Sequence, residues 1–155
     1  MTEIERKFLV ALPPEDLEAH PAKPILQGYV AIGTEGTEVR LRRKGERYFE
    51  TVKSGRGLER AESEIELTRE QFNDLWPAVG DRQVEKTRYL IPLGDLTVEL
   101  DVYAGRLSGL VTAEVEFASV AASSAFEPPL WLGVEVTEDE RYKNRNLALR
   151  GLPAG

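Results

Sequence analysis

Most of the chain alternates between apolar and polar positions with a period of two, which is the pattern of half-buried β-strands. Clusters of Pro and Gly interrupt the alternation at short intervals, as expected of turns between neighbouring strands. Because short turns join most neighbours, we expect the strands to pair antiparallel. The alternation predicts about eight strands, near residues 2–10, 25–32, 37–44, 47–54, 58–67, 82–92, 96–103 and 110–118.

A few segments have helical rather than strand character. Residues 68–79 begin with Thr68 followed three residues later by Gln71, a capping-box pattern, and then carry apolar residues at helical spacing. This helix is expected to pack on the sheet. The other predicted helices are a short turn at 13–19, a short helix near 118–124 and a C-terminal helix at about 139–150, before Gly151.

The polar positions of the strands carry paired formal charges, and the two members of a pair mostly share one sign. Examples are Glu62 with Glu64 and Arg40 with Arg42. Side chains at positions i and i+2 lie on one face of a strand, so nearly every strand offers one apolar and one charged face. Taken singly, each strand fits a two-sided sheet whose charged face is solvated. Taken together, the rows of like charge repel one another unless a ligand of opposite sign neutralises them.

We therefore predict a mainly β fold, a closed eight-stranded antiparallel β-barrel whose interior is charged and whose apolar outer face is covered by helices. An open, cupped sheet would show the same alternation. The inward acidic positions offer oxygen ligands for hard cations, and the basic ones offer a cradle for an anion. A ligand that needs both is a phosphate chain with Mg²⁺ or Mn²⁺. The basic set is Arg40, Arg42, Lys53, Lys86 and Arg88.

Composition narrows the choice of metal and partner. The 155 residues suit a single domain, 1–155, and they include no cysteine and one histidine, which excludes thiolate sites and multi-histidine zinc sites. A formal net charge of −7 argues against a nucleic-acid or membrane partner. The N-terminus is charged from residue 3 and no apolar stretch approaches the ~20 residues that cross a bilayer. We expect a cytoplasmic protein.

The sequence also resembles the CYTH superfamily, the triphosphate tunnel metalloenzymes. The signature strand of that superfamily, E-x-E-x-K, is matched by Glu3, Glu5 and Lys7. Further blocks follow in the expected order: GYV at 28–30, EVRLRRK at 38–44, TVKSG at 51–55, E-x-E at 62–64, EKTRY at 85–89, ELDVY at 99–103, AEVEF at 113–117 and VTEDERYKN at 136–144. The compact size, the KSG block and the RYKN segment are most similar to the short bacterial inorganic triphosphatases.

The resemblance implies an eight-stranded tunnel that hydrolyses inorganic triphosphate (tripolyphosphate) to pyrophosphate and phosphate with one or two Mg²⁺ or Mn²⁺ ions. It also implies a C-terminal helix that plugs one mouth, and a possible homodimer. The expected phosphate-binding residues are Arg40, Arg42, Lys53, Lys86, Arg88 and Lys7. The expected metal ligands are Glu3, Glu5, Glu62, Glu64, Asp101, Glu114 and Glu116. The expected catalytic residues are Lys7, Tyr29, Glu5 and Glu116.

Among these catalytic residues, Glu5 or Glu116 would accept a proton from the attacking water. Lys7 and Tyr29 are linked in similar triphosphatases to a preference for inorganic triphosphate. Two alternatives stay open at this point. One is another activity of the superfamily, such as a nucleoside or thiamine triphosphatase or a class IV-type adenylyl cyclase. The other is a non-catalytic protein that binds polyphosphate or a nucleotide, which would bind triphosphate without releasing phosphate.

Overall fold

A computed structural model describes residues 4–55 and 61–154. Eight strands form one sheet in the order β1-β8-β7-β6-β2-β3-β4-β5, and every neighbouring pair is antiparallel. The strands are β1 (Ile4–Leu9), β2 (Ala22–Ile32), β3 (Glu38–Lys44), β4 (Arg47–Ser54), β5 (Ala61–Leu67), β6 (Gln83–Leu93), β7 (Leu96–Tyr103) and β8 (Val111–Phe117). The predicted eight antiparallel strands are confirmed, and most of the predicted ends lie within three residues of the observed ones.

The helical segments are short. They are η1 (Leu17–Ala19), α1 (Arg69–Leu75), η3 (Trp76–Val79), η4 (Gly105–Leu107), α2 (Val120–Ala125), η5 (Glu140–Tyr142) and α3 (Asn144–Arg150), where η marks a 3₁₀-helix. Within the described part of the chain, no helix is both long and apolar enough to cross a membrane.

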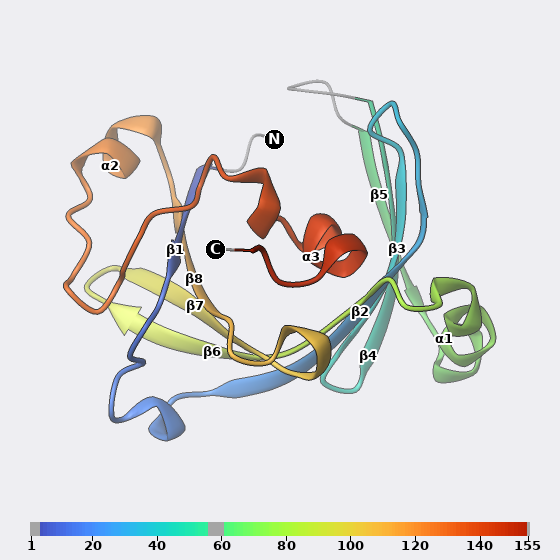
Figure 1. Cartoon of the computed structure of the whole chain (residues 1–155), viewed down its shortest axis with the longest axis horizontal. Helices are drawn as coiled ribbons and strands as arrows, with labels where there is room; N and C mark the ends of the chain where they lie inside the picture. Colours follow the sequence, from blue (N-terminus) through green and yellow to red (C-terminus); the bar gives the residue numbers. More distant parts are fainter. Residues whose placement is uncertain (1–3, 56–60, 155) are drawn as a thin grey trace.

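The sheet curves into an open C rather than a closed barrel (Figure 1). Closure would require β1 to pair with β5, the strands at the two ends of the sheet, and no ladder joins them over the described residues. The predicted closed barrel is therefore not confirmed. The outer edge of β1 is instead covered by residues 133–137. The Leu9 N–H donates to the Val134 carbonyl and the Val136 N–H to the Lys7 carbonyl, both at 2.8 Å. These bonds occupy the edge groups that β5 would need.

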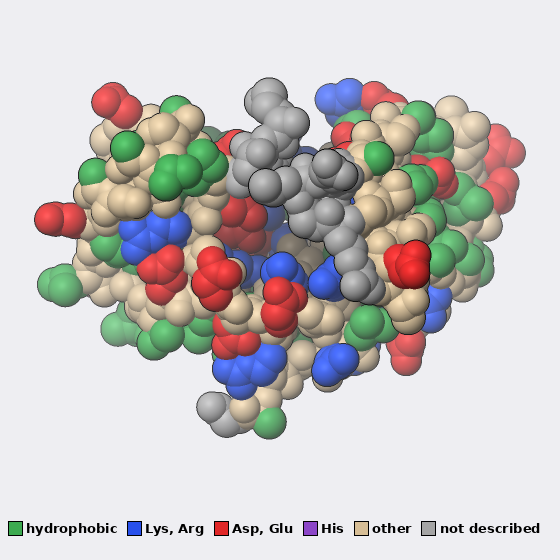
Figure 2. Space-filling model, turned by 90° about the horizontal axis from the view of Figure 1, so that it is seen from above, with side chains coloured by type: hydrophobic (Ala, Val, Ile, Leu, Met, Phe, Trp, Pro, Cys, Tyr) green, Lys and Arg blue, Asp and Glu red, His purple; other side chains and the backbone are tan. Residues whose placement is uncertain are grey.

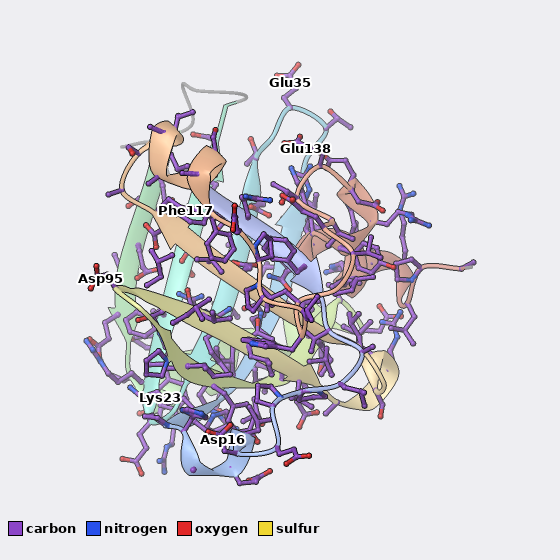
Figure 3. The ribbon with its side chains drawn as sticks, turned by 90° about the vertical axis from the view of Figure 1, so that its left-hand side faces the viewer. Asp16, Lys23, Glu35, Asp95, Phe117 and Glu138 are labelled. Carbon is purple, nitrogen blue, oxygen red and sulfur yellow. The ribbon has the colours of Figure 1, made fainter. Side chains whose placement is uncertain are left out.

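The convex side of the sheet carries two apolar clusters, each under a helical segment. Near β1 and β8, the ring of Phe126, just after α2, lies 6.3 Å from Phe8 and 5.2 Å from Phe117. Figure 3 shows Phe117 close to α2. Near β3 and β4, the ring of Phe72 from α1 lies 5.0 Å from Tyr48 and 5.1 Å from Trp76. The predicted placement of apolar strand faces beneath helices is thus confirmed on this side.

The predicted helix 68–79 exists, but its geometry changes along its length. The capping box is present, because the Gln71 N–H bonds to the Thr68 hydroxyl and the Gln71 side chain accepts from the Thr68 N–H. The α-helix gives way to 3₁₀ geometry at Trp76, next to Pro77, which has no N–H to continue the α-helical ladder. The 3₁₀ turn packs tightly on β2. A Cβ at Gly28 would lie 2.3 Å from a Val79 methyl, so only glycine fits there.

The C-terminal segment differs from the single helix predicted at 139–150. A 3₁₀ turn ends at Tyr142, Lys143 is extended (φ −70°, ψ 139°), and α3 begins at Asn144. In a continuous helix the Tyr142 carbonyl would accept from the N–H four residues later. Here the ammonium of Lys7 donates to that carbonyl at 2.6 Å, and the Asn146 N–H bonds to the Lys143 carbonyl instead. At the point where the helix is interrupted, its backbone acceptor is thus used by a side chain from the sheet.

Helix α3 lies inside the C, on the concave side of the sheet (Figure 1). Leu147 and Ala148 are buried against Tyr29, Val84 and Tyr103, which occupy inward positions of β2, β6 and β7. Complete burial of a leucine side chain contributes about 1.5–3 kcal/mol, so this contact anchors the helix. The concave face is therefore charged over much of its area but aromatic and aliphatic where α3 rests, a local exception to the charged interior predicted from the alternation.

Candidate active site

A cavity of about 930 Å³ opens on the concave face, between the sheet and the C-terminal segment. Seen from above, acidic and basic side chains gather around this hollow (Figure 2). The strands supply one wall and residues 136–150 supply the other. Six of the predicted site residues line the cavity: Glu5, Lys7, Tyr29, Arg40, Lys53 and Glu114. Side chains from β1, β2, β3, β4 and β8 thus reach one space because they share the inward parity of their strands.

A buried ion network made by Lys86, Arg88 and Asp101 occupies inward positions of β6 and β7. Lys86 Nζ lies 2.9 Å from Asp101 Oδ2, and both side chains are almost fully buried, at 1% and 2% exposure. Arg88 contacts the same carboxylate through two nitrogens, at 2.8 and 3.0 Å, and also reaches Glu99 at 2.8 Å. Both oxygens of Asp101 are thus used to hold two cations in fixed positions.

The protonation of this network follows from its surroundings. Burial lowers the pKa of Lys86, and the Asp101 carboxylate opposes that shift. Burial alone would raise the pKa of Asp101, but Lys86 and Arg88 more than offset it, so the pKa of this carboxyl lies below its ordinary value. Burial also acts to lower the pKa of Arg88, and the bonds to Asp101 raise it overall. Asp101 is therefore an anion that is already neutralised by protein cations.

The positive charges of the β3 arginines Arg40 and Arg42 are less well compensated by protein groups than those of Lys86 and Arg88. The buried Nε atoms of Arg40 and Arg42 have no hydrogen-bond partner among the described residues. Burial lowers the pKa of Arg42, and the neighbouring positive charges of Arg40 and Arg88 lower it further, while Glu64 opposes them. Three guanidinium groups therefore repel one another on one face of the sheet. An anion between them would relieve that repulsion and satisfy the unused donors.

Lys7 joins the sheet to the C-terminal segment. Besides its 2.6 Å bond to the Tyr142 carbonyl, its ammonium lies 3.6 Å from Glu114 on the neighbouring strand. The side chain is 12% exposed and faces the cavity. An ammonium has three donors, so Lys7 can keep both contacts and still bind one ligand oxygen.

Tyr29 is both a packing residue and part of the cavity wall. Its ring contacts the cluster under α3, and only 2% of its surface is exposed. Burial raises the pKa of Tyr29 to about 12, against a smaller opposing effect of Arg40. The hydroxyl is therefore protonated at neutral pH, and toward a substrate it can act as a hydrogen-bond donor but not as a base.

The acidic residues predicted as metal ligands are spread over the sheet. Glu5 and Glu116 are directly opposite each other on β1 and β8. Glu62 and Glu64 lie on β5, at the other end of the strand order, where Glu64 accepts a bond from Thr51 at 2.8 Å. Within 4–55 and 61–154, no three carboxylate or histidine side chains are close enough to hold an ion. Glu3 lies outside the described residues.

Scattered carboxylates of this kind suit an ion such as Mg²⁺ or Mn²⁺ that shares its coordination with substrate and water, rather than an ion enclosed by protein ligands alone. Mg²⁺ is usually held by one or two carboxylates together with substrate phosphates and water. Glu5 lines the cavity and Glu116 lies directly opposite it on β8, so this pair offers that number of hard oxygen donors. Glu114 lies two residues before Glu116 on the same face of β8, although it is close to Lys7.

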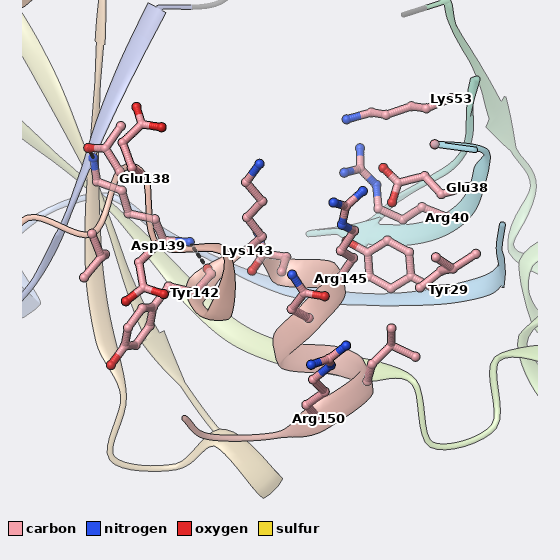
Figure 4. Close-up of a pocket in the computed structure, with 18 of the residues that line it drawn as sticks. Tyr29, Glu38, Arg40, Lys53, Glu138, Asp139, Tyr142, Lys143, Arg145 and Arg150 are labelled. Atoms are coloured by element: carbon pink, nitrogen blue, oxygen red, sulfur yellow. Dashed lines mark hydrogen bonds between the residues drawn. The ribbon is translucent and has the colours of Figure 1, made fainter. Parts of the chain in front are cut away.

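The sequence prediction missed some residues of the cavity wall, namely Glu38, on β3, and Arg145 and Arg150 of the C-terminal segment (Figure 4). Lys143, which the sequence offers as a possible phosphate contact, also lines the cavity. Figure 4 shows the side chains of Arg40, Lys53 and Arg145 extending toward the same space. The density of basic residues in this segment was a usable signal. Arg141, from the same segment, is not among the described residues that line the cavity, and its guanidinium pairs with Asp139 at 2.7 Å.

Comparisons with known proteins find similar sequences that cover almost the whole chain. An inorganic triphosphatase of Nitrosomonas europaea is 57% identical over 151 residues, which are 96% of this chain and 98% of that protein. An inorganic triphosphatase of Acetivibrio thermocellus is 36% identical over 149 residues, 94% of this chain and 92% of that protein. A crystal structure of an inorganic triphosphatase matches with a TM-score of 0.81 and 51% identity, covering 99% of this chain and 98% of that one. No protein-family model matches the sequence.

Proposed function

Since the chain belongs to the inorganic triphosphatases of the CYTH superfamily, we propose that it hydrolyses inorganic triphosphate to pyrophosphate and phosphate on the concave face of its sheet. The observation that carries this proposal is the row of incompletely paired guanidinium groups. Arg40 and Arg42 have buried donors without a protein partner among the described residues, and Arg88 adds a third positive charge to the same face. A triphosphate chain supplies several anionic oxygens to such a row.

In this proposal the cationic side chains form two groups, according to whether a protein carboxylate holds them in place. Lys86 and Arg88 are fixed by Asp101 and bind phosphate oxygens from rigid positions. Arg40, Arg42 and Lys53 bind from the β3 and β4 side of the cavity. Preorganised cations stabilise the charge that develops on a transferred phosphoryl group without reorganising during the reaction, which is the main protein contribution in phosphoryl transfer.

We propose that Glu5 and Glu116, with Glu3 and Glu114, hold one or two Mg²⁺ or Mn²⁺ ions together with the substrate. When bound, such an ion neutralises charge on the phosphate chain and activates a water molecule. Asp101 stays in its ion network and acts on the cations. Glu62 and Glu64 face Lys53 and Thr51 across the β4–β5 pair, which suits a role in holding that wall.

The chemical step follows from these positions. Water adds to the terminal phosphorus, the bond between that phosphorus and the bridging oxygen breaks, and pyrophosphate leaves. The proton of the attacking water passes to a carboxylate, Glu5 or Glu116, at the rim. Lys7, two residues from Glu5 on β1, and Tyr29, on β2, donate hydrogen bonds to the phosphate chain, and burial keeps the tyrosine protonated by raising its pKa. Because Lys7 and Tyr29 both line the cavity, they favour a compact, wholly inorganic phosphate chain as the substrate.

We further propose that the substrate is enclosed by the C-terminal segment rather than by pairing of β1 with β5. The segment covers the edge of β1, is bonded by Lys7 and places α3 inside the C. Enclosure excludes water and strengthens each electrostatic contact. A tunnel-like site would thus form from an open sheet and the segment that fills its gap.

Phosphate release from tripolyphosphate, ATP, thiamine triphosphate and pyrophosphate, each with Mg²⁺ and with Mn²⁺, tests the proposal. Cavity volume does not separate these substrates, because about 930 Å³ lies at the upper end of ordinary ligand pockets. We expect fast release from tripolyphosphate and little from the others, with none in EDTA. Preference for an organic triphosphate would keep the site and overturn the substrate. Binding without release would overturn the enzyme.

A matched pair of variants locates the reaction. Arg40→Ala removes a guanidinium from the cavity, and we expect kcat to fall about 10²- to 10³-fold, as for other preorganised donors. Arg47→Ala removes an arginine that is 67% exposed and paired with Glu66 on the rim of β4 and β5. It should leave kcat near the wild-type value. Equal effects of the two substitutions would place the reaction elsewhere.

A further inference from the structure

Asn144, the first residue of α3, is in contact with the buried ion network. Its Oδ1 accepts a bond from the Tyr103 hydroxyl at 3.2 Å and lies 3.5 Å from Lys86 Nζ. The Tyr103 hydroxyl in turn accepts from Thr112 at 3.3 Å. A single amide oxygen on the C-terminal helix therefore connects to side chains of three strands, β6, β7 and β8.

Lys86 has few other contacts that fix its ammonium. Its side chain is 1% exposed, Asp101 accepts one donor at 2.9 Å, and the Tyr103 ring lies 5.4 Å away. An ammonium carries three donors, and Asp101 and Asn144 accept from two of them, which leaves one donor. Two acceptors from different elements define the direction of that remaining donor better than one acceptor could. Asp101 fixes it from the sheet, and Asn144 fixes it from the helix.

The position of Asn144 is itself firmly set. Leu147 and Ala148, within the next turn, are fully buried against the floor of the concave face. Arg106 donates to the Ala148 carbonyl at 3.3 Å, and Lys7 holds the preceding turn through the Tyr142 carbonyl. The helix therefore holds the Asn144 amide at a fixed place relative to β6. Any loosening of the helix moves an acceptor of Lys86.

We propose that Asn144 is a positioning residue that aims the Lys86 ammonium at the substrate, so that a seated C-terminal helix is a condition for full activity. This inference rests on the proposed function, in which Lys86 binds a phosphate oxygen. It gives α3 a part in the chemistry that is distinct from covering the cavity. A displaced donor costs up to about 100-fold in rate even when it remains nearby.

The test is a double-mutant cycle between Asn144→Ala and Lys86→Ala, measured as kcat/KM for tripolyphosphate with Mg²⁺. We expect Asn144→Ala to lower kcat/KM about 10- to 100-fold in the wild-type background. In the Lys86→Ala background the same change should have little further effect, because its target is gone. Asn144→Asp keeps an oxygen acceptor at the same place and should recover most of the lost kcat, with a higher KM because of its negative charge.

Asn146→Ala is the matched control. Asn146 belongs to the same helical turn, and its amide donates to the Glu140 carbonyl at 2.7 Å. Its removal loosens the segment without touching Lys86, so any loss should be equal in both backgrounds. An additive cycle for Asn144, or an equal loss for Asn144→Ala and Asn146→Ala, would overturn the positioning role. Circular dichroism and thermal unfolding of each variant check that the protein as a whole has folded.

A failure of the proposed function can be distinguished from a failure of the positioning role of Asn144. If the wild-type protein binds tripolyphosphate but releases no phosphate, hydrolysis is overturned, and the same cycle is measured as Kd by calorimetry. Coupling between Asn144 and Lys86 in Kd would then still support the positioning role. If tripolyphosphate does not bind at all, both proposals fall together. If the wild-type protein is active and the cycle is additive, only the role of Asn144 is lost.

Discussion

Replacing Asp101 with Asn should destabilise the protein strongly, because it leaves the buried ammonium of Lys86 without its charged partner. The Lys86 and Asp101 side chains are 1% and 2% exposed and 2.9 Å apart. Removing one partner of a buried ion pair costs about 3–5 kcal/mol, chiefly because the remaining charge stays desolvated. For a protein of this size, 1 kcal/mol corresponds to roughly 2–4 °C, so Tm should fall by about 6–20 °C.

Glu99→Gln provides the comparison that tests burial as the cause. Glu99 also pairs with Arg88 at 2.8 Å, the distance between Arg88 and Asp101, but its side chain is 32% exposed. Partly exposed pairs contribute at most about 1 kcal/mol, so Tm should change by no more than a few degrees. A further variant, Asp101→Asn with Lys86→Met, removes both charges, and it should be more stable than Asp101→Asn alone.

Thermal and urea unfolding followed by circular dichroism, with EDTA present, measures these differences without a divalent ion. If Asp101 acted mainly as a metal ligand, Asp101→Asn would have little effect in EDTA and a large effect with Mg²⁺. That outcome, or equal shifts for Asp101→Asn and Glu99→Gln, would refute the assignment of Asp101 to the ion network. A double variant no more stable than Asp101→Asn would refute the uncompensated charge of Lys86 as the cause.

Further expectations concern packing, capping and alkaline pH. Gly28→Ala should cost about 1–3 kcal/mol in urea unfolding, because its Cβ would lie 2.3 Å from a Val79 methyl. Thr68→Ala should cost about 1 kcal/mol by loss of the helix cap, which Thr68→Ser should restore. Burial raises the pKa of Tyr29 and of Tyr103 to about 12, above the unfolded value near 10. Each therefore gives stability that is complete below pH ~10 and is lost between pH ~10 and ~12, up to about 2.7 kcal/mol. Absorbance at 295 nm should show these two tyrosines ionising near pH 12.

Strand positions and their inward faces could be predicted because both follow from a local pattern. An alternation such as that of residues 38–44 fixes which side chains share a face, and Arg40 does line the cavity as expected. Closure of the sheet could not be predicted in the same way. It depends on competition for the edge of β1, and the segment that covers that edge, 133–137, is short and follows a proline-rich loop. Its own alternation of Val134 and Val136 was the only signal.

The chemical roles were harder to predict than the faces, because a face does not specify a partner. Asp101 has the inward parity of a metal ligand, but its neighbours in register are cations of β6, and these take both of its oxygens. Tyr29 and Val84 share the inward parity of charged residues, yet they form the floor under α3. Asn144 ends the RYKN segment of the family resemblance, but its contact with Lys86 could not be predicted, because that contact depends on where the helix places it.

The open sheet and the position of the C-terminal segment have one structural cause. Residues 133–137 bond to β1 where a closed barrel would place β5, which leaves a gap in the wall. The same segment then continues into the turn held by Lys7 and into the helix that carries Asn144. An open sheet alone would expose a row of repelling arginines to water from the side. Because the segment that covers the β1 edge also carries α3 inside the C, the element that covers the cationic face is the one that brings Asn144 to Lys86.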